Sequence, residues 1–179
     1  MVLKTWSLVA AVLITLSACG TQNLLYRTDK YSLEYPTEWQ VFGKNENDLR
    51  ELDTVFFKFN VEKEVIASIS IFTKKLVLEG DFEEYLKQEI ESLNQIEGYA
   101  EIEVEKFKIA EIETLLHTFK ASDGDVQKEF LQTYLPGTDE LYILTASVGV
   151  EPESVVLSEI KKIFKSFKLK EVEESKVNA

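Results

Sequence analysis

Hydrophobic and polar residues alternate along most of the chain between residues 31 and 150, which is the pattern of β-strands with one buried face. The expected strands cover residues 31–35, 55–61, 65–72, 100–105, 109–121, 126–135 and 141–150. Turns rich in Gly, Asp, Ser and Pro at residues 122–125 and 136–140 favour an antiparallel meander. In the expected strand at 65–72, both the odd- and the even-numbered positions are apolar or small, so we expect other elements to pack on both faces of this strand.

Two segments carry apolar residues at helical spacing instead. We expect Asp81 to cap the first helix and Gly98 to end it, whereas Pro152 is well placed at the start of the second. The apolar stripes are Phe82, Leu86, Ile90 and Leu93 in the first helix, and Val156, Ile160, Ile163, Phe164 and Phe167 in the second. Two amphipathic helices and about six strands therefore share one core, which predicts a single α+β domain.

The N-terminal segment has the pattern of a secretory signal. One charge, on Lys4, precedes an apolar run at residues 6–16 that is too short to span about 30 Å of hydrocarbon. The following Leu16-Ser17-Ala18-Cys19 resembles the lipobox of bacterial lipoprotein signals. This resemblance implies that Cys19 receives a diacylglyceryl thioether and becomes the first residue of the mature chain. The alternative is an ordinary secreted protein whose cysteine falls at this position by chance.

These observations divide the chain into four parts. We expect a lipoprotein signal peptide at 1–18, a lipidated flexible tether at 19–29, a folded domain at 30–170 and a disordered polar tail at 171–179. Two or three acyl chains, at about 0.8 kcal/mol per buried CH₂, would hold the protein stably at a membrane. The expected location is the extracytoplasmic side of a bacterial cell envelope.

The charge of the chain excludes several classes of partner. The chain contains 20 Lys and Arg residues against 32 Asp and Glu residues, which gives a net charge of −12. Removal of the signal peptide, which contains Lys4, would leave 19 basic residues against 32 acidic ones. Nucleic acid is excluded as a partner because no basic stripe is present to replace its counterions. Anionic headgroups would repel the acidic domain, so we expect the lipid alone to hold it. One Cys excludes an internal disulfide, and one Cys with one His cannot supply the three or four nitrogen and sulfur ligands of a zinc site.

Candidates for catalysis are few, and we expect no enzyme. The single histidine, His117, lies in a predicted strand with no cysteine near it, and we interpret it as a half-buried or surface residue. Ser158 and Lys161 match the Ser-x-x-Lys pattern, but on a solvated helix face and without a companion motif. Paired carboxylates could still support a small envelope hydrolase, although most Asp and Glu are expected to face outward.

Three further residues are candidates for binding. Asp123 and Asp125 could offer oxygen ligands to Ca²⁺, but no Glu closes a twelve-residue loop and a hairpin turn explains them. Weak binding of a divalent cation or a solute stays open as another alternative function. Trp39 could anchor a protein interface, although a core position with its indole N–H bonded to the backbone is the favoured interpretation.

The order of these segments resembles a known family. Tyr31-Ser-Leu-Glu-Tyr-Pro36-Thr-Glu-Trp39, the strand ending Glu140-Leu-Tyr-Ile-Leu-Thr-Ala146 and a closing helix running into Ser166-Phe-Lys-Leu169 are similar to PsbP-type domains. These are extrinsic lumenal proteins of photosystem II and their bacterial relatives. The resemblance spans about Tyr26 to Lys170.

The resemblance to PsbP-type domains carries implications for both fold and function. It implies a single antiparallel β-sheet of about six strands with helices packed on both faces. It also implies a non-catalytic accessory or assembly module that docks on a membrane protein complex, with photosystem II as the partner if the source is a phototroph. Cyanobacterial members are lipoproteins, which agrees with Cys19, and the resemblance also implies weak binding of a divalent cation at an acidic edge.

Overall fold

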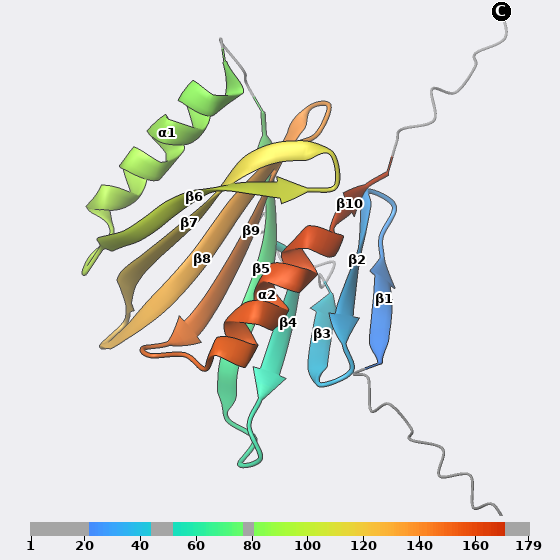
Figure 1. Cartoon of the computed structure of the whole chain (residues 1–179), viewed down its shortest axis with the longest axis vertical. Coiled ribbons are helices and arrows are strands. Elements are labelled where there is room, and N and C mark those ends of the chain that lie inside the picture. Colours follow the sequence, from blue (N-terminus) through green and yellow to red (C-terminus); the bar gives the residue numbers. More distant parts are fainter. Residues whose placement is uncertain (1–21, 44–51, 77–80, 171–179) are drawn as a thin grey trace, which may run out of the picture.

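The computed structural model describes residues 22–43, 52–76 and 81–170, in which ten strands, two α-helices and one 3₁₀-helix follow one another (Figure 1). The elements are β1 (Asn23–Arg27), β2 (Tyr31–Pro36), β3 (Trp39–Gly43), β4 (Leu52–Phe59), β5 (Val65–Lys75), α1 (Phe82–Ser92), η1 (Leu93–Gln95), β6 (Ala100–Ile109), β7 (Ile112–Asp123), β8 (Val126–Pro136), β9 (Glu140–Gly149), α2 (Ser154–Ser166) and β10 (Lys168–Leu169). The predicted signal peptide, the polar tail and Cys19 lie outside the described residues.

The strands form two antiparallel sheets. The large sheet has seven strands in the order β3-β4-β5-β9-β8-β7-β6, and the small sheet has three in the order β1-β2-β10. The prediction of a single sheet of about six strands is therefore wrong. Alternation identified β2 as a strand, but β2 pairs with β1 and β10 instead of joining the large sheet. A strand's own sequence specifies which face is buried and leaves its hydrogen-bonding partner open.

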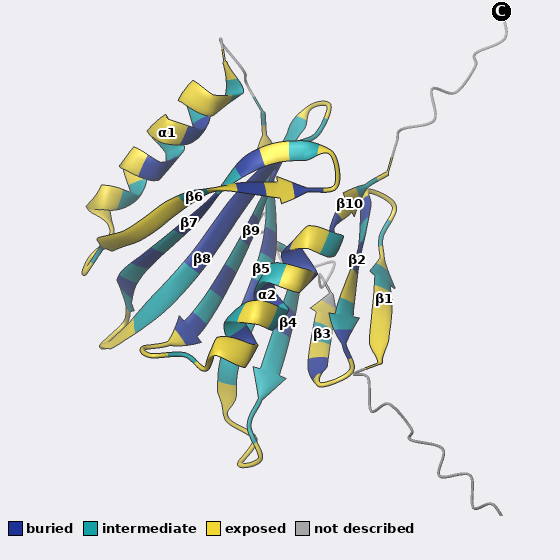
Figure 2. Cartoon of the chain, viewed as in Figure 1, coloured by how far each residue is buried: buried dark blue, intermediate teal, exposed yellow. Residues whose placement is uncertain are grey.

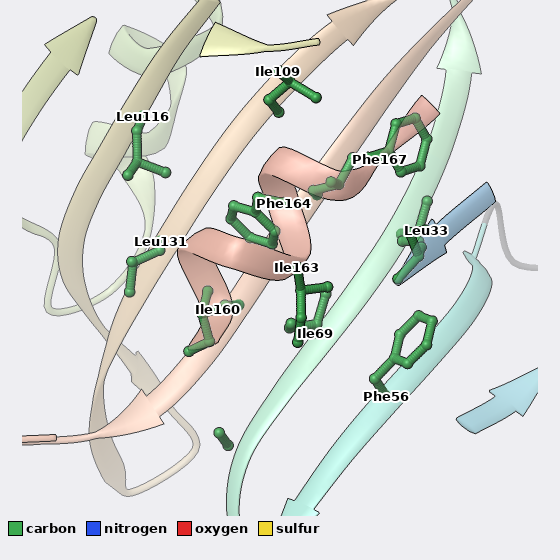
Figure 3. Packing of buried hydrophobic residues seen from close by; sticks show 14 of the residues in the cluster. Leu33, Phe56, Ile69, Ile109, Leu116, Leu131, Ile160, Ile163, Phe164 and Phe167 are labelled. Carbon is green, nitrogen blue, oxygen red and sulfur yellow. The ribbon is translucent and has the colours of Figure 1, made fainter. Parts of the chain in front are cut away.

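Helices cover both faces of the large sheet, as the family resemblance implied. The apolar stripe of α2, from Val156 to Phe167, is buried together with residues of the small sheet against one face (Figure 3). The opposite face receives α1, where Leu86 and Ile90 pack against Tyr134 and Leu141. Asp81 caps α1 by accepting a hydrogen bond from the Glu83 amide at 3.2 Å, as its position predicted.

The helix α1 is short, and it leaves part of its face of the sheet uncovered. Strand β5 was expected to be buried on both faces, and the structure buries only one of them. Ala67, Ile69 and Ile71 are buried on the α2 side, whereas Ser68 and Ser70 on the opposite side are half-buried. Figure 2 shows buried and half-buried positions along the central strands of the large sheet. The small hydroxyl side chains explain the apparently two-sided apolar pattern, because they are tolerated in either environment.

The predicted flexible tether contains a strand. Residues Asn23–Arg27 form β1, which pairs with β2 in a continuous register from Asn23↔Pro36 to Arg27↔Ser32. Tyr26 is the side chain that ties β1 to the core, since its hydroxyl lies 3.0 Å from Oγ1 of Thr54 and its ring packs edge-on against Phe56. Leu24, Leu25 and Tyr26 follow one another without the alternation that marks a half-buried strand, so the sequence signal for β1 is weak. The folded domain therefore begins earlier than residue 30, where the sequence placed its start.

The edge strand β6 is more exposed than its alternation predicted. Ile102 and Val104 were expected to face the core, but their exposed fractions are 49% and 39%. The pairing of β6 with β7 is irregular between Glu101 and Glu103, which shifts the register of the side chains. In addition, α1 packs over β7, β8 and β9, so it does not bury the first half of β6.

Gly98 and Gly124 both have a left-handed backbone, and together they allow a matched test of the close contact between Gly98 and Ser122. Gly98 has φ +69°, and a Cβ there would lie 2.4 Å from Oγ of Ser122; Gly124 has φ +62° and open space around it. We expect Gly124→Ala to lower the free energy of unfolding by about 1 kcal/mol through backbone strain. Gly98→Ala should cost about 1 to 2 kcal/mol more because Ser122 must also move. Urea unfolding of both variants measures the difference, and equal losses would contradict the close contact at Ser122.

Candidate functional site

Trp39 lies in the core and presents no interface. Its side chain is 2% exposed at the start of β3, and the indole N–H donates a hydrogen bond of 3.1 Å to Oε2 of Glu159 on α2. The same carboxylate oxygen accepts a hydrogen bond from Nζ of Lys58 on β4. The core interpretation of Trp39 is thus the one observed, although its partner is a carboxylate and not the backbone. An exposed anchor at Trp39 is excluded in this conformation.

Asp123 and Asp125 occupy the turn between β7 and β8. Oδ2 of Asp123 lies 2.5 Å from Nζ of Lys128, so this carboxylate already has a cationic partner. Across the residues that the structure describes, no group of three or more His, Cys, Asp and Glu side chains is arranged to hold a metal ion. Weak Ca²⁺ binding at this turn stays a prediction that calorimetry can test.

The other residues that the sequence suggested for catalysis are Ser158, Lys161 and paired carboxylates, and the structure does not bring them together into a reactive group among the residues it describes. Ser158 is exposed on α2, while Nζ of Lys161 donates a hydrogen bond of 2.7 Å to Glu105 on β6. A hollow of about 390 Å³ beside the start of α1 is lined by Asp81 and Glu83 among others. Asp81 caps the helix and Glu83 lies 3.1 Å from Lys87, so these two carboxylates have structural partners. Glu113, the third carboxylate in the lining, is exposed on β7.

His117 differs most from its sequence interpretation. It was expected to be half-buried or at the surface, and its side chain is fully buried. The ring stacks on Phe119 with centroids 4.8 Å apart, and Nε2 lies 3.2 Å from the hydroxyl of Tyr99 and 3.7 Å from Oε2 of Glu101. Nδ1 has no hydrogen-bond partner among the described residues. Because no part of the imidazole is accessible, it cannot contact a substrate in this conformation.

Burial lowers the pKa of His117, while the charge of Glu101 opposes this shift. The histidine is therefore neutral at pH 7. The sequence placed His117 in a strand, but how completely its neighbours would enclose it depended on contacts far away in the sequence.

The lowered pKa predicts a pH dependence of stability. Between about pH 6.5 and the lowered pKa, the unfolded chain binds a proton that the folded chain does not, so stability falls as the pH falls. Urea unfolding at pH 7.5 and 5.5 should show this slope, and His117→Phe should remove most of it. Glu140, whose pKa is lowered by its hydrogen bond from Lys30, contributes only at more acidic pH. An unchanged slope in His117→Phe would refute the assignment.

An aromatic patch, defined as Phe42, Phe57 and Phe59, lies on β3 and β4. The ring centroids of Phe42 and Phe57 are 5.5 Å apart and those of Phe57 and Phe59 are 6.3 Å apart. Phe42 is 52% exposed, and none of the three belongs to the cluster that α1 buries. Sequence alternation predicted the strand that carries Phe57 and Phe59, but it predicted no strand at Phe42 and could not show that α1 stops short of these rings. Exposed aromatic rings of this kind are typical of protein interfaces.

Comparison with known proteins supports the fold. No protein-family model matches the chain, and no curated protein sequence matches it significantly. Among solved structures, cyanobacterial PsbP (CyanoP) from Synechocystis sp. PCC 6803 matches with a TM-score of 0.58 and 14% identity, over 87% of this chain and 99% of that one. LpqN, involved in cell envelope biogenesis of Mycobacterium tuberculosis, matches with a TM-score of 0.60 and 11% identity, over 84% of this chain and 91% of LpqN.

These likenesses establish the class of domain. The chain has a PsbP-like α+β fold, in which antiparallel sheet and two helices share one core. The resemblance of the sequence to PsbP-type domains is confirmed at the level of the fold. In the described part of the chain, neither helix has the length and apolar character needed to cross a membrane.

Proposed function

We propose that this protein is a lipid-anchored, extracytoplasmic accessory or assembly module that docks on a membrane protein complex without catalysing a reaction. The observation that carries the proposal is the PsbP-like fold, which covers nearly the whole of both CyanoP and LpqN. One of these is a cyanobacterial PsbP and the other is involved in cell envelope biogenesis, so an envelope role fits both likenesses. Photosystem II is the partner only where the source is a phototroph.

The anchor in this proposal is Cys19. Its lipobox context supports lipidation, and the described chain begins only three residues later at Gln22. Lipidation at this position would confine the folded domain to the membrane surface, where a membrane complex is within reach.

The aromatic patch is the part of the described surface best suited to contact a protein subunit. Phe42 offers an exposed ring on an edge strand, and this ring packs edge-on against Phe57 of the neighbouring strand. Aromatic side chains of this kind bury large apolar area at little entropic cost, which is why they are enriched in interface cores.

Photocrosslinking in the native host tests the proposal. A photoreactive benzoylphenylalanine at Phe42 should yield a light-dependent adduct with one membrane protein, which affinity purification and mass spectrometry then identify. The same residue at Thr138, in the turn between β8 and β9, is the control and should give no such adduct. A protein that stays monomeric and uncrosslinked at both positions would contradict a docking role.

A further inference from the structure

Exposed valines gather at one end of the molecule. Among the described residues, eleven large hydrophobic side chains are exposed, and five of them are valines in or beside the turns at this end. The five, which we call the valine end, are Val61 (100% exposed), Val65 (53%), Val126 (59%), Val150 (46%) and Val155 (53%). Val65, Val126 and Val150 line one shared hollow of about 420 Å³, so they form a continuous surface.

The strand registers place these turns side by side. Lys58 of β4 pairs with Ala67 of β5, which pairs with Val148 of β9, so the β4–β5 hairpin and the segment leading to α2 lie together. Val148 also pairs with Glu129 of β8, which brings the β7–β8 turn to the same end. In Figure 1 the β4–β5 hairpin, which carries Val61, projects furthest at the lower end.

The described chain also begins at the valine end. The carbonyl oxygen of Gln22 accepts a hydrogen bond of 3.1 Å from the Thr37 amide in the β2–β3 turn. That turn precedes Trp39, whose partner Lys58 leads into the β4–β5 hairpin. Cys19 lies three residues before Gln22, and three fully extended residues span at most about 11 Å.

We infer that the valine end rests on the lipid bilayer that holds the anchor, with Val61 inserted most deeply. This inference rests on the proposed lipidation of Cys19, because a lipid at Cys19 forces the bilayer surface to within about 11 Å of Gln22. Apolar side chains then enter the boundary between headgroups and acyl chains, where their burial is favourable. The contact orients the domain and leaves the other end facing away from the membrane.

The turns at the opposite end of the domain are polar. These turns, at residues 28–30, 110–111 and 137–139, contain none of the exposed large hydrophobic side chains found in the described chain. Instead, Lys30 makes two hydrogen bonds to Glu140 there, of 2.7 and 2.9 Å. An end of this kind is suited to water, so the apolar and polar ends of the domain are clearly distinguished.

The charges at the valine end predict which lipids it accepts. Glu62 and Glu64 flank Lys63 in the β4–β5 turn, and Glu151 and Glu153 flank Pro152 before α2. Negative charge in this region is repelled by anionic headgroups over about a Debye length, about 10 Å at 0.1 M salt. The valine end should therefore insert better into zwitterionic than into anionic bilayers, and added salt should strengthen its contact with anionic ones.

Depth-dependent fluorescence quenching tests the inference on the full lipidated protein. The chain has one cysteine, and lipidation converts its sulfur to a thioether, so an introduced Val61→Cys supplies the only free thiol for a fluorophore. In phosphatidylcholine vesicles containing a shallow spin-labelled lipid, the label at Val61 should be quenched about threefold more strongly than a label at Thr138→Cys. Replacing part of the phosphatidylcholine with phosphatidylglycerol should reduce this quenching at low salt, and high salt should restore it.

The possible failures are distinguishable. Equal or absent quenching at both positions, in protein that floats with the vesicles, would overturn the orientation and leave the anchor intact. Protein that does not float would overturn the lipidation of Cys19 and with it this inference. Quenching at Val61 that occurs in native membranes but not in pure lipid vesicles would overturn the lipid contact and assign the valine end to a protein partner instead.

Discussion

Cys19→Ser is expected to move the protein from the membrane to the soluble fraction. A serine oxygen cannot accept the diacylglyceryl group through a thioether, so the mature protein would lose its acyl chains. Those chains provide the anchor, at about 0.8 kcal/mol per buried CH₂. We expect that the domain cannot replace them, because the chain is strongly acidic and the proposed bilayer contact of the valine end is shallow.

Cell fractionation with immunoblotting measures this release, and metabolic labelling with palmitate shows whether Cys19 carries lipid. Ser17→Ala is a matched control, because it changes the same motif while keeping a small residue and the cysteine. We expect the control to stay in the membrane fraction. Retention of Cys19→Ser in that fraction would show that another part of the chain holds the protein, and would contradict the anchor.

Phe164→Ala is expected to lower the free energy of unfolding by about 3 to 5 kcal/mol. Phe164 is fully buried on α2, and Figure 3 shows its ring among the side chains that join α2 to the large sheet. Truncation removes buried apolar area and leaves a cavity that the surrounding strands cannot fill completely. Since domains of this size are stable by about 5 to 15 kcal/mol, the loss is a large part of the total.

Phe42→Ala is the control for Phe164→Ala, because the same truncation at a 52% exposed ring should cost about 1 kcal/mol or less. Urea unfolding followed by tryptophan fluorescence measures both variants. Trp6 lies in the predicted signal peptide, so in the cleaved protein Trp39 alone reports on the core. Equal losses in the two variants would contradict the central position of Phe164.

The two helices could be read from the sequence because their signals are local. Helical spacing specified the buried stripe of α2 from Val156 to Phe167, and Asp81 marked the start of α1. Both features involve residues within a few turns of one another, so no distant contact is needed to recognise them. The same is true of the lipobox, a short linear motif whose meaning does not depend on the fold.

The pairing of the strands could not be predicted from such local sequence signals. Alternation located β2, but only long-range pairing showed that β2 belongs to a separate sheet with β1 and β10. It also placed His117 in a strand without showing that this side chain would be fully enclosed. In both cases the outcome depends on which distant segments cover the strand, and a periodic pattern carries no information about that.

The sequence by itself determined the class of domain, the apolar stripes of its helices and Cys19 as the candidate anchor, because these are properties of neighbouring residues. Only the tertiary structure decided that Trp39 is buried, that Phe42 of the aromatic patch is exposed and that five exposed valines share the end at which the described chain begins. The valines lie in or beside separate turns, and antiparallel pairing with its particular registers is what brings them together.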